Sequence, residues 1–249
     1  MRNEMDTVLE NVKRYLQESQ NIVCVTGLRT VVEAGGIDIW DRDNLYRIEK
    51  EYNASPEELL SAGVFATKKE KFYDFYKKET LTQLPTPGPA FYALKKLQDV
   101  GKLKMTVSMN IYGLEYGVGL HNVVEIQGNI HSHYCPECRN NFSPEYVRDS
   151  VGVPVCNKCK VAIRPGIRLF GERVRNDLYT AAAQACADAD MVIVLGTNLY
   201  GEKVQYVTGH YKGSRLVLIN DKPHFSDRYA DYVLYGRTDE ILPRMVDEL

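Results

Sequence analysis

The stretch Asn21-Ile-Val-Cys-Val-Thr26-Gly27 is a short β-branched run that ends in Thr-Gly. A continuous apolar run of this kind is typical of a strand covered on both faces, as the strands of parallel sheets are. Similar runs occupy residues 102–108, 191–195 and 215–219. We expect all four to be strands of one sheet, with ligands bound near their carboxyl ends.

Helical segments alternate with these strands. Residues 5–18 place apolar side chains on one face at helical spacing, and residues 89–100 and 177–190 lead into the strands at 102–108 and 191–195. This alternation predicts an α/β fold with a doubly wound parallel sheet.

Two stretches interrupt the alternation. Residues 41–85 contain short charged and aromatic helical segments, one starting at Ser55-Pro-Glu-Glu with Ser as the N-cap. Residues 130–168 contain a cluster of cysteines. We expect both to be insertions that form a small second domain.

The composition limits the class of protein. With 249 residues the chain can bury enough surface to fold without disulfides. No run approaches the roughly 20 apolar residues of a membrane span, and the opening Met1-Arg-Asn-Glu-Met-Asp6 does not resemble a signal peptide. A cytoplasmic location without membrane attachment is expected. The formal charge of -2 gives no electrostatic footprint for nucleic acid, which is excluded as a primary ligand.

The cysteines form two Cys-x-x-Cys pairs, which are Cys135, Cys138, Cys156 and Cys159. Each short turn can aim two thiolates at one ion, and their spacing lies within the range of a zinc ribbon. Four thiolates leave no position for water, so the expected zinc is structural. The alternative is a redox or disulfide-bonded pair.

The remaining cysteines and the nearby histidines have simpler interpretations. Cys24 lies within a strand and Cys186 in an Ala-rich helix, where both are expected to be small core residues. His131 and His133 precede the first cysteine pair, and we expect them to be loop histidines without a metal.

Several motifs together resemble the sirtuins, the NAD-dependent protein lysine deacylases. The matching residues run in register from about residue 8 to 246 and include Thr26-Gly27, Asn110, Glu125-Ile-Gln-Gly128, Arg164-Pro165, Phe170-Gly-Glu172, Gly196-Thr-Asn-Leu199 and Ile219-Asn220. The resemblance implies a large Rossmann-like domain and a small zinc-ribbon and helical module, with a cleft for NAD and an acyl-lysine peptide. The large domain would comprise residues 1–40, 86–129 and 169–249, and the small one residues 41–85 and 130–168.

The NAD loop departs from the family pattern T-G-A-G-I-S-x-x-S-G-I-P-D-F-R. The corresponding stretch is Thr26-Gly-Leu-Arg-Thr-Val-Val-Glu-Ala-Gly-Gly-Ile-Asp-Ile-Trp40, in which Thr26, Gly27, Gly35 and Asp38 are kept. Glycine is used there because the backbone must approach a pyrophosphate closely. Arg29, in the middle of this loop, has two interpretations: it contacts an anion in place of the usual phosphate contact, or it points to solvent.

The catalytic positions depart further. Asn110 matches the family asparagine that faces the nicotinamide ribose, whereas Tyr112 replaces an aspartate and Gln127 replaces the catalytic histidine. A carboxamide has no basic nitrogen near neutral pH, so Gln127 cannot act as the general base.

The residues that correspond to the adenosine-binding part of the family cleft match the family pattern more closely than the NAD loop does. The segment that corresponds to the peptide-binding strand contains a charged residue. The resemblance assigns Gly196, Thr197, Asn198 and Asn220 to the phosphates and adenosine. In Ile167-Arg168-Leu169 strand alternation turns Arg168 away from its apolar neighbours, so it is expected to be exposed.

Three hypotheses on function follow. In the first, ordinary deacylation is lost or severely impaired, and the chain is a binding or regulatory pseudoenzyme that keeps a cleft for an adenine nucleotide or ADP-ribose. In the second, the chain is an NAD-dependent ADP-ribosyltransferase or NAD glycohydrolase that uses Asn110. In the third, it is an active deacylase with relocated catalytic groups, and His121 is the nearest histidine to nominate.

Overall fold

The computed structural model describes residues 2–249, with side chains from Met5 onward. The chain forms two compact units. Unit 1 comprises the chain up to Ala34 together with Thr86–Ile126 and Arg175–Leu249, and unit 2 comprises Gly35–Pro85 and Gln127–Val174. Each unit is described by itself.

Unit 1 is built on a parallel sheet, as predicted. Its six strands follow the order β3-β2-β1-β6-β7-β8, and every neighbouring pair is parallel. The strands are β1 (Ile22–Thr26), β2 (Leu103–Ser108), β3 (Val123–Glu125), β6 (Met191–Leu195), β7 (Leu216–Asn220) and β8 (Tyr232–Tyr235). The short β3 and β8 lie at the two edges and were not predicted from the sequence.

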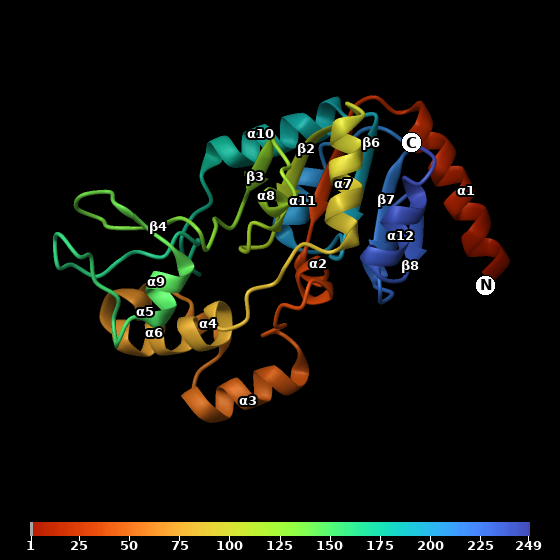
Figure 1. Ribbon diagram of the computed structural model, residues 1–249. Helices are drawn as coiled ribbons and strands as arrows, with labels where there is room; N and C mark the ends of the chain where they lie inside the picture. Colours follow the sequence, from red (N-terminus) through yellow and green to blue (C-terminus); the bar gives the residue numbers. More distant parts are fainter. Residues whose placement is uncertain (1) are drawn as a thin grey trace. The chain divides into compact units, whose positions relative to one another are not determined.

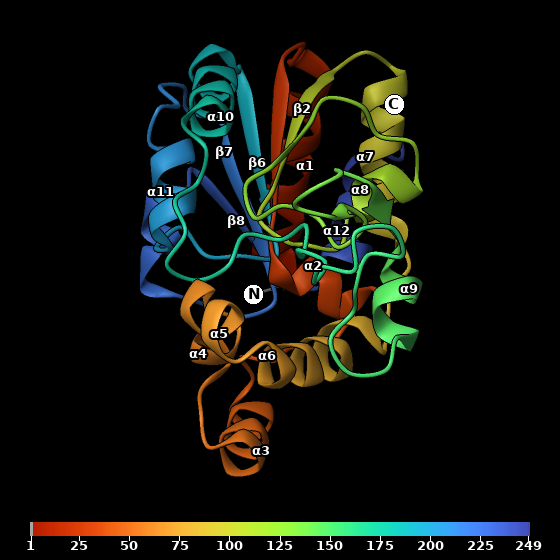
Figure 2. The ribbon, with the colours of Figure 1, turned by 90° about the vertical axis from the view of Figure 1, so that its left-hand side faces the viewer.

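Helices cover both faces of this sheet. Figure 2 shows α10 (Asn176–Asp188) and α11 (Glu202–Thr208) on one face, and α7 (Pro89–Asp99) and α12 (Thr238–Met245) on the other. The shorter elements are α8 (Leu114–Gly117) and a 3₁₀ turn, η2 (Phe225–Tyr229). The opening helix α1 (Arg2–Glu18) contacts the edge strand β8. The predicted helices at 5–18, 89–100 and 177–190 are therefore α1, α7 and α10. Because both faces are covered, every residue of β1, β6 and β7 is buried.

The segment after β1 contains a helix. α2 (Leu28–Glu33) begins directly after Gly27, where the resemblance implied a glycine-rich loop. This helix has the sequence Leu28-Arg-Thr-Val-Val-Glu33, and its residues Thr30 and Val31 are buried.

Unit 2 combines a helical part and a cysteine-containing part (Figure 1). The helical part contains α3 (Arg42–Tyr52), α4 (Pro56–Leu59), α5 (Ala62–Thr67), α6 (Lys69–Tyr76) and a π-helical turn, η1 (Lys77–Leu81). Ser55 caps α4 as expected, because its hydroxyl accepts from the Glu58 backbone N–H at 3.2 Å. The rings of Phe72, Tyr73, Phe75 and Tyr76 are fully buried and form the core of this part.

The cysteine-containing part holds a small hairpin and one helix. The strands β4 (His133–Tyr134) and β5 (Asn141–Phe142) pair antiparallel, and α9 (Pro144–Asp149) follows them. Across residues 2–249, none of the helices is both long and apolar enough to span a bilayer.

Candidate functional site

The carboxyl ends of the central strands form a pocket in unit 1. Thr26 lies opposite Ser108 and Leu195, and Leu195 lies opposite Ile219, so these strands end at one edge of the sheet. The order β2-β1-β6 makes this edge a topological switch point, the usual ligand position in such sheets. A hollow of about 440 Å³ lies there, lined by Leu28, Arg29, Gly196, Thr197, Asn198, Asn220, Asp221, Lys222, Pro223 and His224.

Two glycines allow the loops after β1 and β6 to touch. A Cβ on Gly27 would lie 2.4 Å from the Thr197 Cβ and 2.7 Å from the Gly196 carbonyl oxygen. The backbone N–H of Arg29 donates to that same carbonyl at 2.9 Å. The Arg29 amide is therefore used within the protein and does not face a ligand phosphate.

Arg29 has a protein partner that neither sequence interpretation named, and its contact with a bound anion stays a prediction. Its Nη2 lies 2.5 Å from Asp221 Oδ2, and both side chains are partly buried in the pocket wall. Asp221 follows β7 directly and was not singled out from the sequence. The guanidinium is drawn to a carboxylate that chain folding brings from 192 residues away. This ion pair lines part of the pocket.

Asn220 supplies an unused acceptor beside this pair. Its Oδ1 is buried and lacks a hydrogen-bond partner among the residues described. An unsatisfied buried acceptor costs free energy, so a hydroxyl or amino donor from a ligand would be favoured there.

A second polar cluster lies where β1 and β2 end. Thr26 Oγ1 donates to Glu115 Oε1 at 2.6 Å, and Asn110 Nδ2 donates to the same oxygen at 3.3 Å. The Asn110 Oδ1 accepts from the Tyr112 backbone N–H at 2.9 Å, so both ends of its carboxamide are held. Burial raises the pKa of the Tyr112 phenol to about 12, which keeps it neutral.

Glu115 is the residue of this cluster that the sequence reasoning missed. Its side chain is fully buried, and its Oε2 has no partner among the described residues. Its position five residues after Asn110 on the short α8 gave no recognisable spacing. His121, the histidine nominated for a relocated base, is exposed, and its backbone N–H donates to Gln98.

Gln127 and Asp38 belong to unit 2, where each has protein partners. Gln127 Oε1 accepts from Arg168 Nε at 2.9 Å, and its carbonyl accepts from the Arg168 backbone N–H at 2.7 Å. Ile167 and Leu169 are buried as strand alternation predicted, but Arg168 is half-buried and hydrogen-bonded, so the expectation of simple exposure was wrong.

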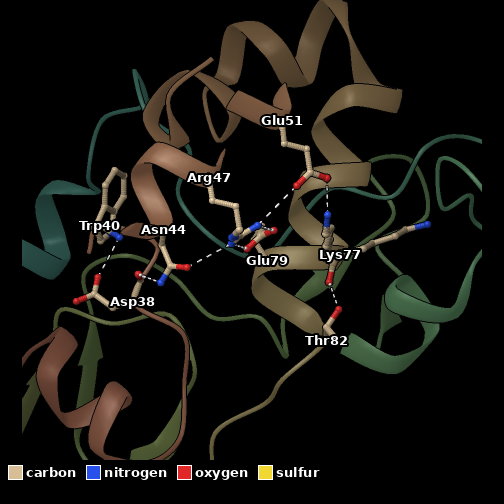
Figure 3. A network of polar contacts seen from close by, with 9 residues as sticks. Asp38, Trp40, Asn44, Arg47, Glu51, Lys77, Glu79 and Thr82 are labelled. Atoms are coloured by element: carbon tan, nitrogen blue, oxygen red, sulfur yellow. Dashed lines mark hydrogen bonds and ion pairs between the residues drawn. The ribbon is translucent and has the colours of Figure 1, made fainter. Parts of the chain in front are cut away.

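Asp38 shapes a turn that leads into α3. Figure 3 shows its carboxylate accepting from the Trp40 backbone N–H, at 3.0 Å, and its carbonyl accepting from Asn44. The same network continues to Arg47, which forms two hydrogen bonds to the buried carboxylate of Glu79 in the π-helical turn. These contacts hold α3 against that turn.

The four predicted cysteines come together in unit 2. The sulfur atoms of Cys135, Cys138, Cys156 and Cys159 all lie within 4.8 Å of one another. The Cys138 and Cys159 backbone N–H groups each point at the first sulfur of their own pair at 3.5 Å, the knuckle arrangement of a zinc ribbon. Four thiolates fit one closed tetrahedral zinc ion. His133 is buried and forms a hydrogen bond with the Tyr76 hydroxyl at 2.9 Å. It is not one of the four metal ligands.

Comparison with known proteins decides the family. The model of the Sir2 family matches residues 30–202. The chain belongs to the Sir2 family. An NAD-dependent protein deacetylase of Clostridium tetani is 34% identical over 98% of this chain and 99% of the relative.

Solved Sir2 structures agree with this assignment. A Sir2 homologue in complex with NAD is 27% identical, has a TM-score of 0.82, and matches 96% of this chain and 92% of that one. A Sir2 protein bound to a propionylated peptide is 25% identical, has a TM-score of 0.80, and matches 96% of this chain and 98% of that one. The predicted Rossmann-like fold with a zinc-ribbon module is thereby confirmed.

Proposed function

We propose that this Sir2-family chain binds the ADP-ribose part of an NAD-derived nucleotide in the unit 1 pocket and an acyl-lysine peptide along residues 167–169. Ordinary lysine deacylation is severely impaired in this proposal. The pocket supports the nucleotide, because it lies at the switch point and offers the unused Asn220 oxygen to a ribose hydroxyl or an amino group. The relatives with bound NAD and bound peptide support both ligand classes.

The observation that carries the loss of deacylation is the Gln127–Arg168 contact. Arginine has no acceptor, so the oxygen of the Gln127 carboxamide must face Arg168 Nε, and the amide nitrogen faces the other way. That nitrogen donates hydrogen bonds and cannot remove a proton from a ribose hydroxyl. A positioned general base contributes about 10²–10⁴-fold to a rate, which sets the expected loss.

The relatives are named deacetylases, and family membership by itself favours the family reaction. Impairment follows from one side chain, Gln127, and its partner Arg168. The nucleotide and peptide ligands do not depend on that argument, since neither requires a base at residue 127.

The hydrogen bonds of Asn110 favour a second candidate, NAD glycohydrolysis or ADP-ribosyl transfer. Its carboxamide is fixed at both ends by Glu115 and the Tyr112 amide, as expected of a group that positions a ligand. Breaking the bond between nicotinamide and ribose does not require deprotonation of a ribose hydroxyl.

Calorimetry with ADP-ribose tests the proposal. We expect ADP-ribose to bind and Asp221→Asn to raise its affinity about threefold to tenfold, because the change removes a carboxylate near the diphosphate. Asp177→Asn, which breaks the exposed Arg175–Asp177 pair, is the matched control and should change nothing.

Three other outcomes are informative. Absence of ADP-ribose binding would contradict the proposal. Deacetylation of a lysine peptide at the rate usual for the family would contradict the impairment. Release of nicotinamide from NAD without deacetylation would support the second candidate.

A further inference from the structure

The backbone places Gln127 and Arg168 side by side in unit 2. Gly128 forms an antiparallel bridge with Ile167, and the Arg168 N–H donates to the Gln127 carbonyl. Gly128 has φ +73°, and a Cβ there would lie 2.3 Å from the Gly166 carbonyl oxygen, so glycine is needed for this close approach. The contact between the two side chains is therefore a consequence of the local fold.

The Gln127 amide nitrogen is directed away from Arg168 and has no protein partner. Its oxygen accepts from Arg168 Nε, which fixes the orientation of the carboxamide. No described residue accepts a hydrogen bond from its Nε2, and the side chain is half-buried. The position that would hold a proton acceptor in a base-catalysed reaction thus presents two N–H donors.

The Arg168 charge is also unmatched. Glu172 is the nearest candidate partner, but its Oε1 lies 2.5 Å from Arg164 and its Oε2 accepts from the Leu169 amide at 2.8 Å. Arg168 Nη1 instead donates to the Glu172 backbone carbonyl at 2.6 Å. No carboxylate in residues 5–249 forms an ion pair with Arg168. Two of its five N–H groups are used in the protein, which leaves three for a ligand.

We propose that Arg168, whose Nε is held by the Gln127 oxygen, binds a carboxylate of the peptide substrate. A half-buried guanidinium without a counter-charge favours an anion, and the flat fork of arginine matches the two oxygens of a carboxylate. Gln127 contributes by holding Arg168 Nε through its oxygen, because its amide nitrogen is directed the other way. The inference rests on the peptide half of the proposed function and deepens it, because it names an acidic substrate.

The carboxylate has two sources, which a set of peptides distinguishes. One peptide carries acetyl-lysine, a second carries succinyl-lysine, and a third carries acetyl-lysine beside an aspartate. Binding of each to the intact protein is measured by fluorescence anisotropy. We expect one acidic peptide to bind at least about tenfold more tightly than the plain acetyl peptide, and the advantage to shrink as salt is added.

Two variants test whether Arg168 causes the preference for acidic peptides. Arg168→Leu should remove the preference, and Arg173→Leu, the loss of an exposed arginine in the same segment, should keep it. Gln127→Glu is the second test. The glutamate carboxylate retains the hydrogen bond to Arg168 and supplies a negative charge that pairs with the guanidinium. This variant should fold normally and abolish the preference for acidic peptides.

Equal affinity for the three peptides would overturn the inference, as would a preference that survives both Arg168→Leu and Gln127→Glu. Failure of all three peptides to bind would overturn it as well. A chain that distinguishes the peptides but binds no ADP-ribose would overturn only the nucleotide half of the proposed function.

Discussion

Several polar side chains in each unit have partners that lie far away in the sequence. The loss of a base at Gln127 is a prediction that rests on the identity of this residue alone. Its partner Arg168 lies 41 residues away, and the ion pair of Arg29 with Asp221 spans 192 residues. Such contacts depend on how the chain is folded, and a single sequence does not contain that information. Glu115 was missed for a different reason, because one carboxylate on a short helix has no spacing pattern.

Restoring a histidine at residue 127 should not restore ordinary deacetylation. In Gln127→His the imidazole would lie beside the Arg168 guanidinium, which donates to the side chain at this position. A neighbouring positive charge disfavours the protonated ring, so the pKa of the histidine falls and it becomes a weaker base.

The double variant Gln127→His, Arg168→Val should therefore exceed Gln127→His by about tenfold in the rate of acetyl-peptide deacetylation, which corresponds to about one unit of histidine pKa. Arg168→Val alone is the control and should remain inactive. Full activity in the single variant would show that Arg168 does not affect this position.

At the scale of elements, buried strands were predictable and the irregular connections were not. β1, β6 and β7 are covered on both faces, so their apolar runs are continuous and easily recognised. The edge strands β3 and β8 are only partly buried and mix polar with apolar residues. α2 lies where the resemblance led us to expect a loop.

The β-bridge between Gly128 and Ile167 predicts a stability cost when Gly128 is replaced. Gly128→Ala should destabilise unit 2 by about 3 kcal/mol, because alanine at φ +73° is strained and its Cβ meets the Gly166 carbonyl. Gly152→Ala is the matched control, since Gly152 has φ +63° but open space around its Cβ, and should cost about 1 kcal/mol.

Urea denaturation followed by tryptophan fluorescence measures this difference. Trp40 is the single tryptophan of the chain, and its ring lies 5.8 Å from that of Phe170 within unit 2. If both variants lose the same free energy of unfolding, the close contact at Gly128 adds nothing to the cost of backbone strain.

At the scale of the whole molecule, the six cysteines divide between the two units. Cys24 and Cys186 are fully buried in unit 1, as expected of small core residues, and the other four form the metal site of unit 2. A closed four-thiolate site contributes to folding directly, because its metal binds the folded ribbon and not the unfolded chain. Zinc should therefore stabilise one unit without holding the core of the other.

Chelation with a thiol reagent present tests this division. Near pH 8 the four metal-site cysteines should react once zinc is removed, and Trp40 fluorescence should change as unit 2 loosens. Cys24 and Cys186 should stay unmodified. Burial raises the pKa of the Cys186 thiol to about 12, so only about one molecule in 10⁴ would carry the reactive thiolate, and burial also raises the pKa of Cys24. In denaturant all six should react at similar rates. Mass spectrometry identifies the modified residues, and labelling of Cys24 or Cys186 as fast as the other four would show that unit 1 does not keep its core without the metal.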